Sequence, residues 1–157
     1  MTVVLFRVDE RLIHGQVVVG WGRRLEAESV IVVSDELAGS ASEQEIYRTG
    51  LPSGLEADFW SEAVAATRLP DEMESDDRIL VLTPDLGTMW RLAVAGVPIH
   101  EVNVGGLHAA SGRESVLPYV YLDPDDRQRV RDFEAAGVRV TAQDVPGGAR
   151  VRLERVL

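Results

Sequence analysis

The sequence predicts an α/β fold: an open, twisted, mostly parallel sheet of about six to seven strands with helices on both faces. Short runs rich in β-branched residues alternate with segments whose apolar residues recur at helical spacing, the pattern of a sheet whose strands are joined by helices. Several runs are apolar almost throughout, as strands covered on both faces are. Neither a repeat nor a linker interrupts the alternation, so we expect residues 1–157 to form a single domain.

Two of the expected strands carry signs of an edge position. In residues 55–60 apolar and polar residues alternate, which predicts a strand near the edge of the sheet. Residues 115–122 contain Pro118, whose missing N–H favours an edge strand or a break. The predicted strands are residues 3–8, 29–34, 55–60, 78–83, 100–106, 115–122 and 138–145.

The clearest expected helix is the last one. Asp123 is a suitable cap, Pro124 suits the first helical position and Gly137 suits the stop. The acidic stretch 69–78 lacks periodicity and predicts a solvated loop, and the glycines after Pro146 predict a turn and a short tail. The predicted helices are residues 14–26, 35–50, 62–68, 84–96 and 123–137.

Composition excludes several classes of function. A formal net charge of −10 disfavours nucleic-acid binding, which needs a basic face. The chain has no cysteine, which excludes disulfides and thiol chemistry and fits a cytoplasmic setting. The first apolar run is broken at Arg7, too early for the apolar core of a signal peptide. No later apolar stretch is long enough to span a bilayer. We therefore expect a cytoplasmic protein that contacts membranes only through a partner.

Three polar segments follow predicted strands directly. They are residues 7–16 (RVDERLIHGQ), 83–85 (TPD) and 105–108 (GGLH). Sheets of this kind place their sites at the carboxyl ends of the strands. We expect these three loops to converge on one rim.

The first of these loops contains the groups that phosphoryl transfer needs. Histidine side chains as a class titrate near neutrality, and the neutral form of a ring such as that of His14 has a nitrogen free to attack phosphorus. Arg7 and Arg11 offer forked donors for phosphate oxygens, next to the free N–H groups that open the following helix. A polar turn with ordinary surface salt bridges is the alternative interpretation of the same residues. The candidates for orienting the second ring nitrogen are Asp9, Glu10 and Gln16.

Other sites receive little support from the sequence. The three histidines, His14, His100 and His108, do not show the spacing of metal ligands, so we expect no metal. The pair Gly105-Gly106 lacks the spacing of a dinucleotide-binding loop, so we expect no cofactor. Trp21 and Trp90 fall on apolar helix faces and are expected in the core.

The opening RVDERLIHGQV resembles the RxDxRLIHGQV signature of the IIB subunits of the mannose–fructose–sorbose class of the bacterial phosphoenolpyruvate-dependent phosphotransferase system (PTS). Further stretches resemble the same family in the same order, so that the similarity covers nearly the whole chain. They are residues 31–36 (IVVSDE), 83–96, 102–113 (VNVGGLHAASGR) and 133–146 (FEAAGVRVTAQDVP).

This resemblance implies a function and a fold. His14 is expected to receive a phosphoryl group on Nδ1 from a phosphohistidine of the IIA protein. It then passes the group to a sugar held by the membrane subunits IIC and IID, as a protein-phosphohistidine–sugar phosphotransferase without a metal or cofactor. The chain would associate peripherally with those membrane subunits, and the family's sheet includes one antiparallel strand. Which sugar is transported stays open.

The resemblance also assigns roles within the loop. It implies that Arg11 and, with less support, Arg7 neutralise the phosphate. Thr83, His108 and Arg113 are candidates for the rim of the site, although each also fits a structural loop residue. An acidic chain would be repelled by an acidic membrane surface. We therefore expect the active face to be locally rich in arginine, with the acidic residues gathered elsewhere.

The chain departs from the family pattern in two places. Glu10 stands where aspartate is usual, and the loop 109–114 is less charged than the family's loop often is. Two other functions stay open: a regulatory phosphoacceptor that uses the same His14 chemistry without sugar transport, and a non-catalytic binding module.

Overall fold

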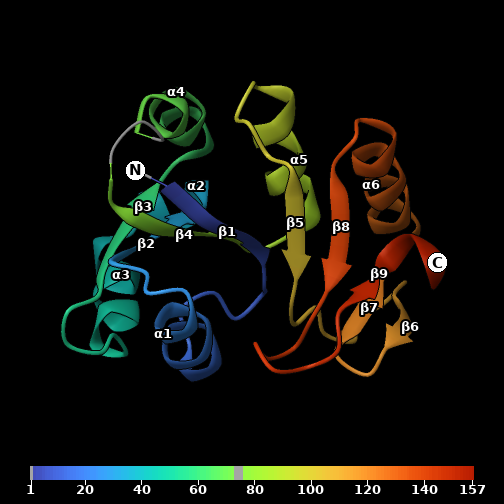
Figure 1. Cartoon of the computed structure of the whole chain (residues 1–157), viewed down its shortest axis with the longest axis horizontal. Helices are drawn as coiled ribbons and strands as arrows, with labels where there is room; N and C mark the ends of the chain where they lie inside the picture. The colour runs from blue at the N-terminus through green and yellow to red at the C-terminus, as the bar shows by residue number, and fades with distance from the viewer. Residues whose placement is uncertain (1, 73–75) are drawn as a thin grey trace.

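The computed structural model describes residues 2–72 and 76–157, and it consists of a seven-stranded sheet with helices packed on it (Figure 1). The strand order is β3-β2-β4-β1-β5-β8-β9. All neighbouring pairs are parallel except β8 and β9, which are antiparallel. The strands are β1 (Thr2–Val8), β2 (Ser29–Val33), β3 (Glu56–Trp60), β4 (Arg78–Thr83), β5 (Glu101–Val104), β8 (Arg139–Ala142) and β9 (Val151–Arg152).

Helices α2, α3, α5 and α6 each begin at a residue whose side chain caps the helix. Asp85 caps α5 by accepting a hydrogen bond from the Thr88 amide at 2.7 Å. Asp123 and Asp126 form a reciprocal capping box at the start of α6, with Pro124 as its first residue, as predicted. The helices are η1 (Gln16–Trp21), α1 (Gly22–Arg24), α2 (Asp35–Ala38), α3 (Ala41–Thr49), α4 (Glu62–Glu72), α5 (Leu86–Val94), α6 (Pro124–Ala135) and η2 (Leu153–Arg155). None of these described helices has the length and apolar character needed to cross a bilayer.

The two faces of the sheet are covered to different extents. On one face, α4, α5 and α6 pack over the larger core cluster, which reaches across the sheet from Ile31 in β2 to Val140 in β8. On the other face, η1 and its neighbours cover a smaller cluster that includes Leu12, Val17 and Leu80. No helix crosses in front of β5 and β8 in Figure 1, so this second face stays open over that half of the sheet. The predicted mostly parallel sheet with helices on both faces is confirmed, with this half as the exception.

The sheet differs from the prediction in one strand. Residues 115–122 do not join it, because they fold into a separate antiparallel hairpin of β6 (Glu114–Leu117) and β7 (Val120–Leu122). Pro118 lies in the turn between them, where the missing N–H costs no ladder hydrogen bond. The antiparallel strand of the main sheet is β9, in the stretch that was expected to be a tail.

Two helices also differ from the prediction. The predicted loop 69–78 is wrong for residues 69–72, because α4 continues to Glu72 and brings the fully buried Leu69 into the core. Residues 73–75 of that loop lie outside the described residues. The helix expected from residue 14 begins at Gln16, and its first six residues form a π-helical turn before α1. Trp21 is buried on this helix, as predicted, whereas Trp90 is half-buried and stacks edge-on against Phe133.

Candidate functional site

The three polar loops predicted to converge do meet at the carboxyl ends of β1, β4 and β5. Strand β1 lies between β4 and β5, so the segments that follow the three strands are neighbours. Backbone hydrogen bonds join them: the Asp9 amide donates to the Thr83 carbonyl at 3.0 Å and the Glu10 amide donates to the Gly106 carbonyl at 2.9 Å. The rim is therefore a hydrogen-bonded unit rather than three independent loops.

The first loop is a tight turn anchored by apolar side chains. The Leu12 amide donates to the Asp9 carbonyl at 3.0 Å, and the Asp9 side chain accepts from the Arg11 amide at 3.0 Å. Leu12 has a φ of 54°, a left-handed conformation that is strained for a leucine and costs about 1–3 kcal/mol. The burial of Leu12 and Ile13 opposes this strain. Together they place His14 at the surface with 18% of its side chain exposed.

Asp9 accepts hydrogen bonds from three side chains at this site. Its carboxylate is fully buried and lies 3.3 Å from Arg7 Nη2, 3.1 Å from Arg11 Nε and 3.3 Å from His14 Nε2. Burial alone would raise the pKa of Asp9, but the hydrogen bonds from His14 and Arg11 outweigh it and hold that pKa well below its ordinary value. Asp9 is therefore ionised at neutral pH.

The ionisation of Asp9 decides which nitrogen of His14 carries the proton. A carboxylate only accepts hydrogen bonds, so the hydrogen shared between the two groups sits on His14 Nε2. In the neutral ring, Nδ1 then keeps its lone pair, and it has no hydrogen-bond partner within the described parts of the chain. Gln16, also a candidate for orienting the ring, instead accepts from Arg11 Nη1 at 3.2 Å.

Arg7 lies beneath the rim and not on it, which corrects the expectation that it neutralises a phosphate. Its side chain is 0% exposed, and its guanidinium donates to the side chain of Asn103, to the Gln143 carbonyl at 2.9 Å and to the Asp144 carbonyl at 3.1 Å. The guanidinium carbon lies 5.0 Å from the centre of the Trp21 ring. Burial lowers the pKa of Arg7, while the charge of Asp9 opposes that shift. No part of this fork is open to a ligand at the surface.

The close approach of these arginines explains the glycine pair after β5. A Cβ at Gly105 would overlap the guanidinium of Arg7 and lie 2.6 Å from Asp9 Oδ2. A Cβ at Gly106 would lie 3.1 Å from Arg11 Nε. Gly105 therefore needs glycine because the buried Arg7 and Asp9 lie against its backbone, whereas a side chain at Gly106 would require Arg11 to shift by a few tenths of an ångström.

Two of the three remaining rim candidates, His108 and Arg113, gather around Glu10. Its carboxylate lies 3.1 Å from His108 Nδ1, bonds to Arg113 Nη1 and accepts from the His108 amide at 3.1 Å. Arg113 also approaches Asp126 at 3.8 Å, and its hydrogen bond with Glu10 raises the pKa of Arg113. Thr83, the third candidate, is buried, and its hydroxyl donates to the Asp85 carbonyl at 2.9 Å. These contacts link His108 and Arg113 to Glu10 and leave Thr83 inside the protein.

Sequence reasoning missed the residues that hold Arg7 in place. Asn103 and Gln143 are buried, and Asn103 stands between Val102 and Val104 in β5. A polar amide at the end of a buried strand was the available signal, because such a group needs a partner.

Charges are distributed only in part as expected. At the rim, Arg11 is paired with Asp9 and Arg113 is paired with Glu10, so that face carries no excess of unpaired arginine among the described residues. Acids do gather elsewhere, around a hollow at the amino ends of the strands. That hollow is lined by Glu28, Glu56, Asp58 and Asp77. Within residues 2–72 and 76–157, no three carboxylates or imidazoles come together in a way that could hold a metal ion.

Comparison with known proteins places this site in a family. The family model for the PTS system sorbose subfamily IIB component matches residues 3–157. The N-acetylgalactosamine-specific phosphotransferase enzyme IIB component 2 of Escherichia coli is 32% identical over 155 residues, which is 99% of this chain and 98% of the relative. The sorbose-specific EIIB component of Klebsiella pneumoniae is 30% identical, over 98% of this chain and 93% of the relative.

Solved structures agree with the sequence comparisons. The IIBSor domain of the sorbose permease from Klebsiella pneumoniae superposes with a TM-score of 0.90 at 26% identity, over 98% of this chain and 94% of the other. An N-acetylgalactosamine IIB component from Streptococcus pyogenes has a TM-score of 0.92 at 25% identity, over 100% of this chain and 98% of the other. The chain therefore belongs to the sorbose subfamily of PTS IIB components, within the mannose class.

Proposed function

We propose that this IIB component accepts a phosphoryl group on Nδ1 of His14 from a phosphohistidine of a IIA protein and passes it to a sugar held by IIC and IID membrane subunits. The observation that carries the proposal is the contact of His14 Nε2 with the buried carboxylate of Asp9 at 3.3 Å. This contact keeps the proton on Nε2 and leaves the lone pair of Nδ1 to attack.

The transfer is a substitution at phosphorus. The lone pair of His14 Nδ1 forms a bond to phosphorus as the donor's N–P bond breaks, and the donor imidazole keeps that electron pair. The attacking ring becomes more positive, and the carboxylate of Asp9 stabilises that charge through Nε2–H. In the second step a sugar hydroxyl attacks phosphorus, the His14 N–P bond breaks, and the hydroxyl proton leaves with a base on the acceptor side.

Arg11 and Arg7 have separate roles in this proposal. Arg11 is 32% exposed and lies beside His14 through their shared partner Asp9, so its guanidinium can donate to the phosphoryl oxygens. Arg7 is a positioning residue, because it touches only Asp9 and the protein interior. The side chain of Gln16 accepts a hydrogen bond from Arg11 Nη1 at 3.2 Å. In this proposal, the N–H groups that open the helix at Gln16 would face the same anion.

The proposed partners follow from the relatives. The mannose-specific EIIAB component of Escherichia coli is 28% identical over 98% of this chain but over 47% of its own length, and its name joins a IIA part to a IIB part. A IIA protein or domain is therefore the proposed donor. Relatives named for N-acetylgalactosamine, sorbose and mannose all match, so we propose that the membrane subunits select the sugar. The chain would act in the cytoplasm, associated peripherally with those subunits.

The test is the intact mass of the protein after incubation with phosphoenolpyruvate, the general phosphorelay proteins and a cognate IIA. Wild type should gain one acid-labile phosphoryl group and His14→Ala should gain none. His14→Ala is expected to stay folded, because a residue on the rim contributes little to the core, and circular dichroism checks this. His108→Ala is the matched control: it removes the other rim imidazole and should still be phosphorylated.

Two results would contradict the proposal. No gain in wild type, with a relay that phosphorylates another IIB component, would favour a non-catalytic binding module. A gain that membrane vesicles containing cognate IIC and IID never pass to sugar would favour a regulatory phosphoacceptor.

A further inference from the structure

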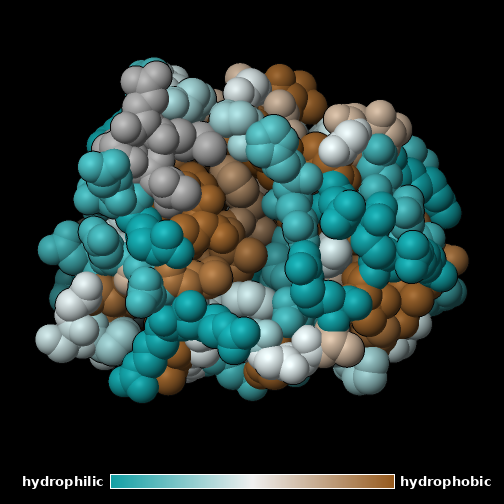
Figure 2. All heavy atoms as spheres, in the orientation of Figure 1, coloured by the Kyte–Doolittle hydropathy of each residue, from teal (hydrophilic) through white to brown (hydrophobic). Residues whose placement is uncertain are grey.

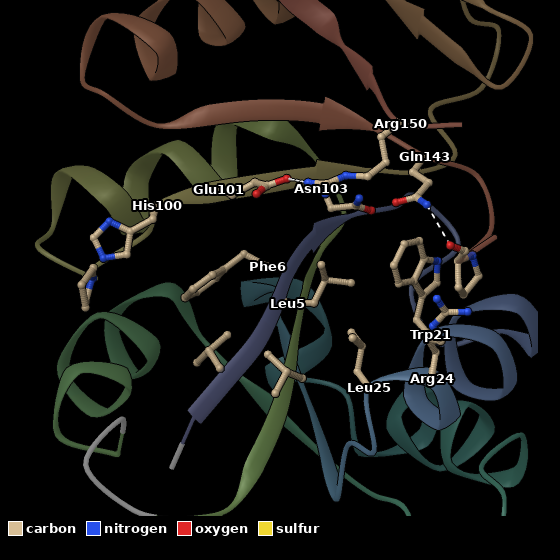
Figure 3. A pocket seen from close by; sticks show the side chains of 14 residues that line it. Leu5, Phe6, Trp21, Arg24, Leu25, His100, Glu101, Asn103, Gln143 and Arg150 are labelled. Atoms are coloured by element: carbon tan, nitrogen blue, oxygen red, sulfur yellow. Dashed lines mark hydrogen bonds and ion pairs between the residues drawn. The ribbon is translucent and has the colours of Figure 1, made fainter. Parts of the chain in front are cut away.

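A cavity of about 540 Å³ lies on the open half of the sheet, between the amino-terminal parts of β1 and β5 (Figures 2 and 3). In Figure 2 it is an apolar hollow next to a polar ridge. Its volume is in the range of ordinary small-molecule sites. The mechanism proposed above does not use it.

The cavity exists because two strands separate and no helix covers them. Strand β1 pairs with β5 only at Arg7↔Asn103 and Val8↔Val104, while it pairs with β4 along its whole length. Toward their amino ends, β1 and β5 diverge, and the half-buried side chain of Leu5 faces the gap (Figure 3). The hollow is therefore a wedge whose narrow end is at Asn103.

The walls combine an apolar surface with positive charge. Leu5, Trp21 and Leu25 provide apolar walls on one side. Arg24 lies at the mouth beside Trp21 (Figure 3), is exposed, and has no hydrogen-bond or ion-pair partner in the described part of the chain. Arg150, across the cavity, is paired with Glu101. The charged lining residues thus leave one uncompensated positive charge on a chain whose net charge is −10.

The narrow end of the cavity is also the support of the phosphorylation site. Three residues that line the cavity, Trp21, Asn103 and Gln143, are among those that hold Arg7. Arg7 in turn contacts Asp9, which contacts His14. A molecule seated in the wedge would touch the residues that set the position of Asp9.

We infer that this cavity binds a small organic anion with a flat apolar body, its charge at Arg24 and its body against Leu5 and Trp21. Occupancy changes the orientation of the His14 ring through Arg7 and Asp9, an effector role that rests on the proposed function. Apolar walls with a few convergent polar groups are the usual composition of such a site, and an unpaired guanidinium selects for a carboxylate or a phosphate monoester.

The test uses three probes of one shape and two matched variants. Naphthalene-2-carboxylate and 2-naphthyl phosphate carry the anion, and naphthalene-2-carboxamide is the neutral control. Binding is followed by NMR at the indole N–H of Trp21 and the side-chain amide of Asn103. Arg24→Gln removes the charge, whereas Arg23→Gln removes its exposed neighbour, which does not line the cavity.

The expected result is that both anions bind and the carboxamide binds at least about tenfold more weakly, the usual worth of a charge-assisted hydrogen bond. Arg24→Gln should lose about tenfold in affinity for the anions, and Arg23→Gln should stay near wild type. Saturation with an anion should also shift the His14 ring resonances and change the initial rate of phosphorylation. Preference for one anion over the other identifies whether a carboxylate or a phosphate ester is the better ligand.

Several outcomes would overturn the inference. Three results would contradict the anion site. They are equal affinity for the carboxamide, equal losses of affinity in the two arginine variants, and NMR chemical-shift changes that do not involve Trp21 and Asn103. Binding without any change at His14 would remove the effector role. His14→Ala separates this from the proposed function, because it should bind the probes normally while taking no phosphoryl group.

Discussion

Two charged networks meet at the first loop and differ in burial. The inner network joins Arg7, Asp9 and Asn103, all of them buried. The outer network joins Glu10, His108 and Arg113, whose side chains are 25%, 57% and 19% exposed. Both hold a loop at the rim with arginine and a carboxylate, and the two carboxylates are adjacent in sequence.

The difference in burial gives the two networks different energies. Removing one partner of a buried ion pair leaves an uncompensated charge and costs about 3–5 kcal/mol. An exposed pair is worth about 0–1 kcal/mol, because water and salt screen it. We therefore expect the inner network to control both folding and the position of His14, and the outer network to adjust only the loop 108–113.

The largest effect on stability is expected from Arg7→Leu. Asp9 would lose a buried cationic partner, so the free energy of unfolding should fall by about 3–5 kcal/mol. Urea denaturation measures it, with Arg113→Leu as the control from the outer network. If the two variants lost the same amount, the distinction between the networks would be wrong. Adding Asp9→Asn to Arg7→Leu should recover part of the loss, because the unpaired carboxylate is then neutral.

Trp21→Ala should be the next most damaging change. The ring is 5% exposed and packs beneath the guanidinium of Arg7, so its removal should cost about 3 kcal/mol or more. Trp21→Phe keeps an aromatic surface under Arg7 and should cost less. Thermal and urea unfolding of the two variants check the order. An alanine variant as stable as the phenylalanine variant would show that the ring does not support the inner network.

Much of the fold could be predicted from local patterns. The β-branched runs that became β1, β2 and β4 are apolar because helices or neighbouring loops cover them. The cap at Asp123 is a local interaction within four residues, so its sequence signal was sufficient. Convergence of the three loops was expected from a parallel sheet together with an assumed strand order, and the observed neighbours β4, β1 and β5 confirm it.

The parts that could not be predicted depend on tertiary packing. Arg7 and Arg11 are both arginines of one signature, and only the position of Arg7 within the central strand β1 decides that Arg7 is buried while Arg11 is partly exposed. Strand β9 has two residues, too few for any periodicity, and forms because β8 offers a free edge. Leu69 ends up in a helix because a buried side chain compensates for the proline that follows it.

Lowering the pH should reduce the contribution of the inner network to stability. The pKa of Asp9 is held below its ordinary value in the folded state, so its contribution to stability is fully present above the ordinary carboxyl pKa of about 4 and is lost as the pH falls below it. The difference in unfolding free energy between wild type and Asp9→Asn should therefore be constant near neutrality and shrink below about pH 4.

Asp126 provides a control of opposite sign. Burial raises the pKa of Asp126. Its carboxyl group therefore contributes to the stability of the fold in acid, and this contribution is lost as the pH rises through the ordinary carboxyl range. Urea unfolding of Asp9→Asn and Asp126→Asn across the same pH series should give opposite trends. Parallel trends would mean that Asp9 is not held ionised by its partners.

Arg11→Lys should slow phosphoryl transfer while leaving the acceptor in place. Arg11 donates to Asp9 through Nε and Nη2 and to Gln16 through Nη1, and lysine replaces this planar fork by a point charge. Loss of one charge-assisted hydrogen bond corresponds to about a tenfold lower rate. Rapid-quench measurement of the rate and intact mass at completion separate rate from stoichiometry. An unchanged rate would remove Arg11 from the transfer step.

Glu10→Gln should have the smallest effect. It removes the charge from the centre of the outer network but keeps an oxygen that can accept from His108 and Arg113. Because this pair is partly exposed, solvent and salt screen it, and the free energy of unfolding should change by no more than about 1 kcal/mol. The rate at His14 should stay within about twofold of wild type, since the inner network is intact. A loss of transfer as large as that of Arg11→Lys would show that the outer network also positions the acceptor, and that the two networks act as one.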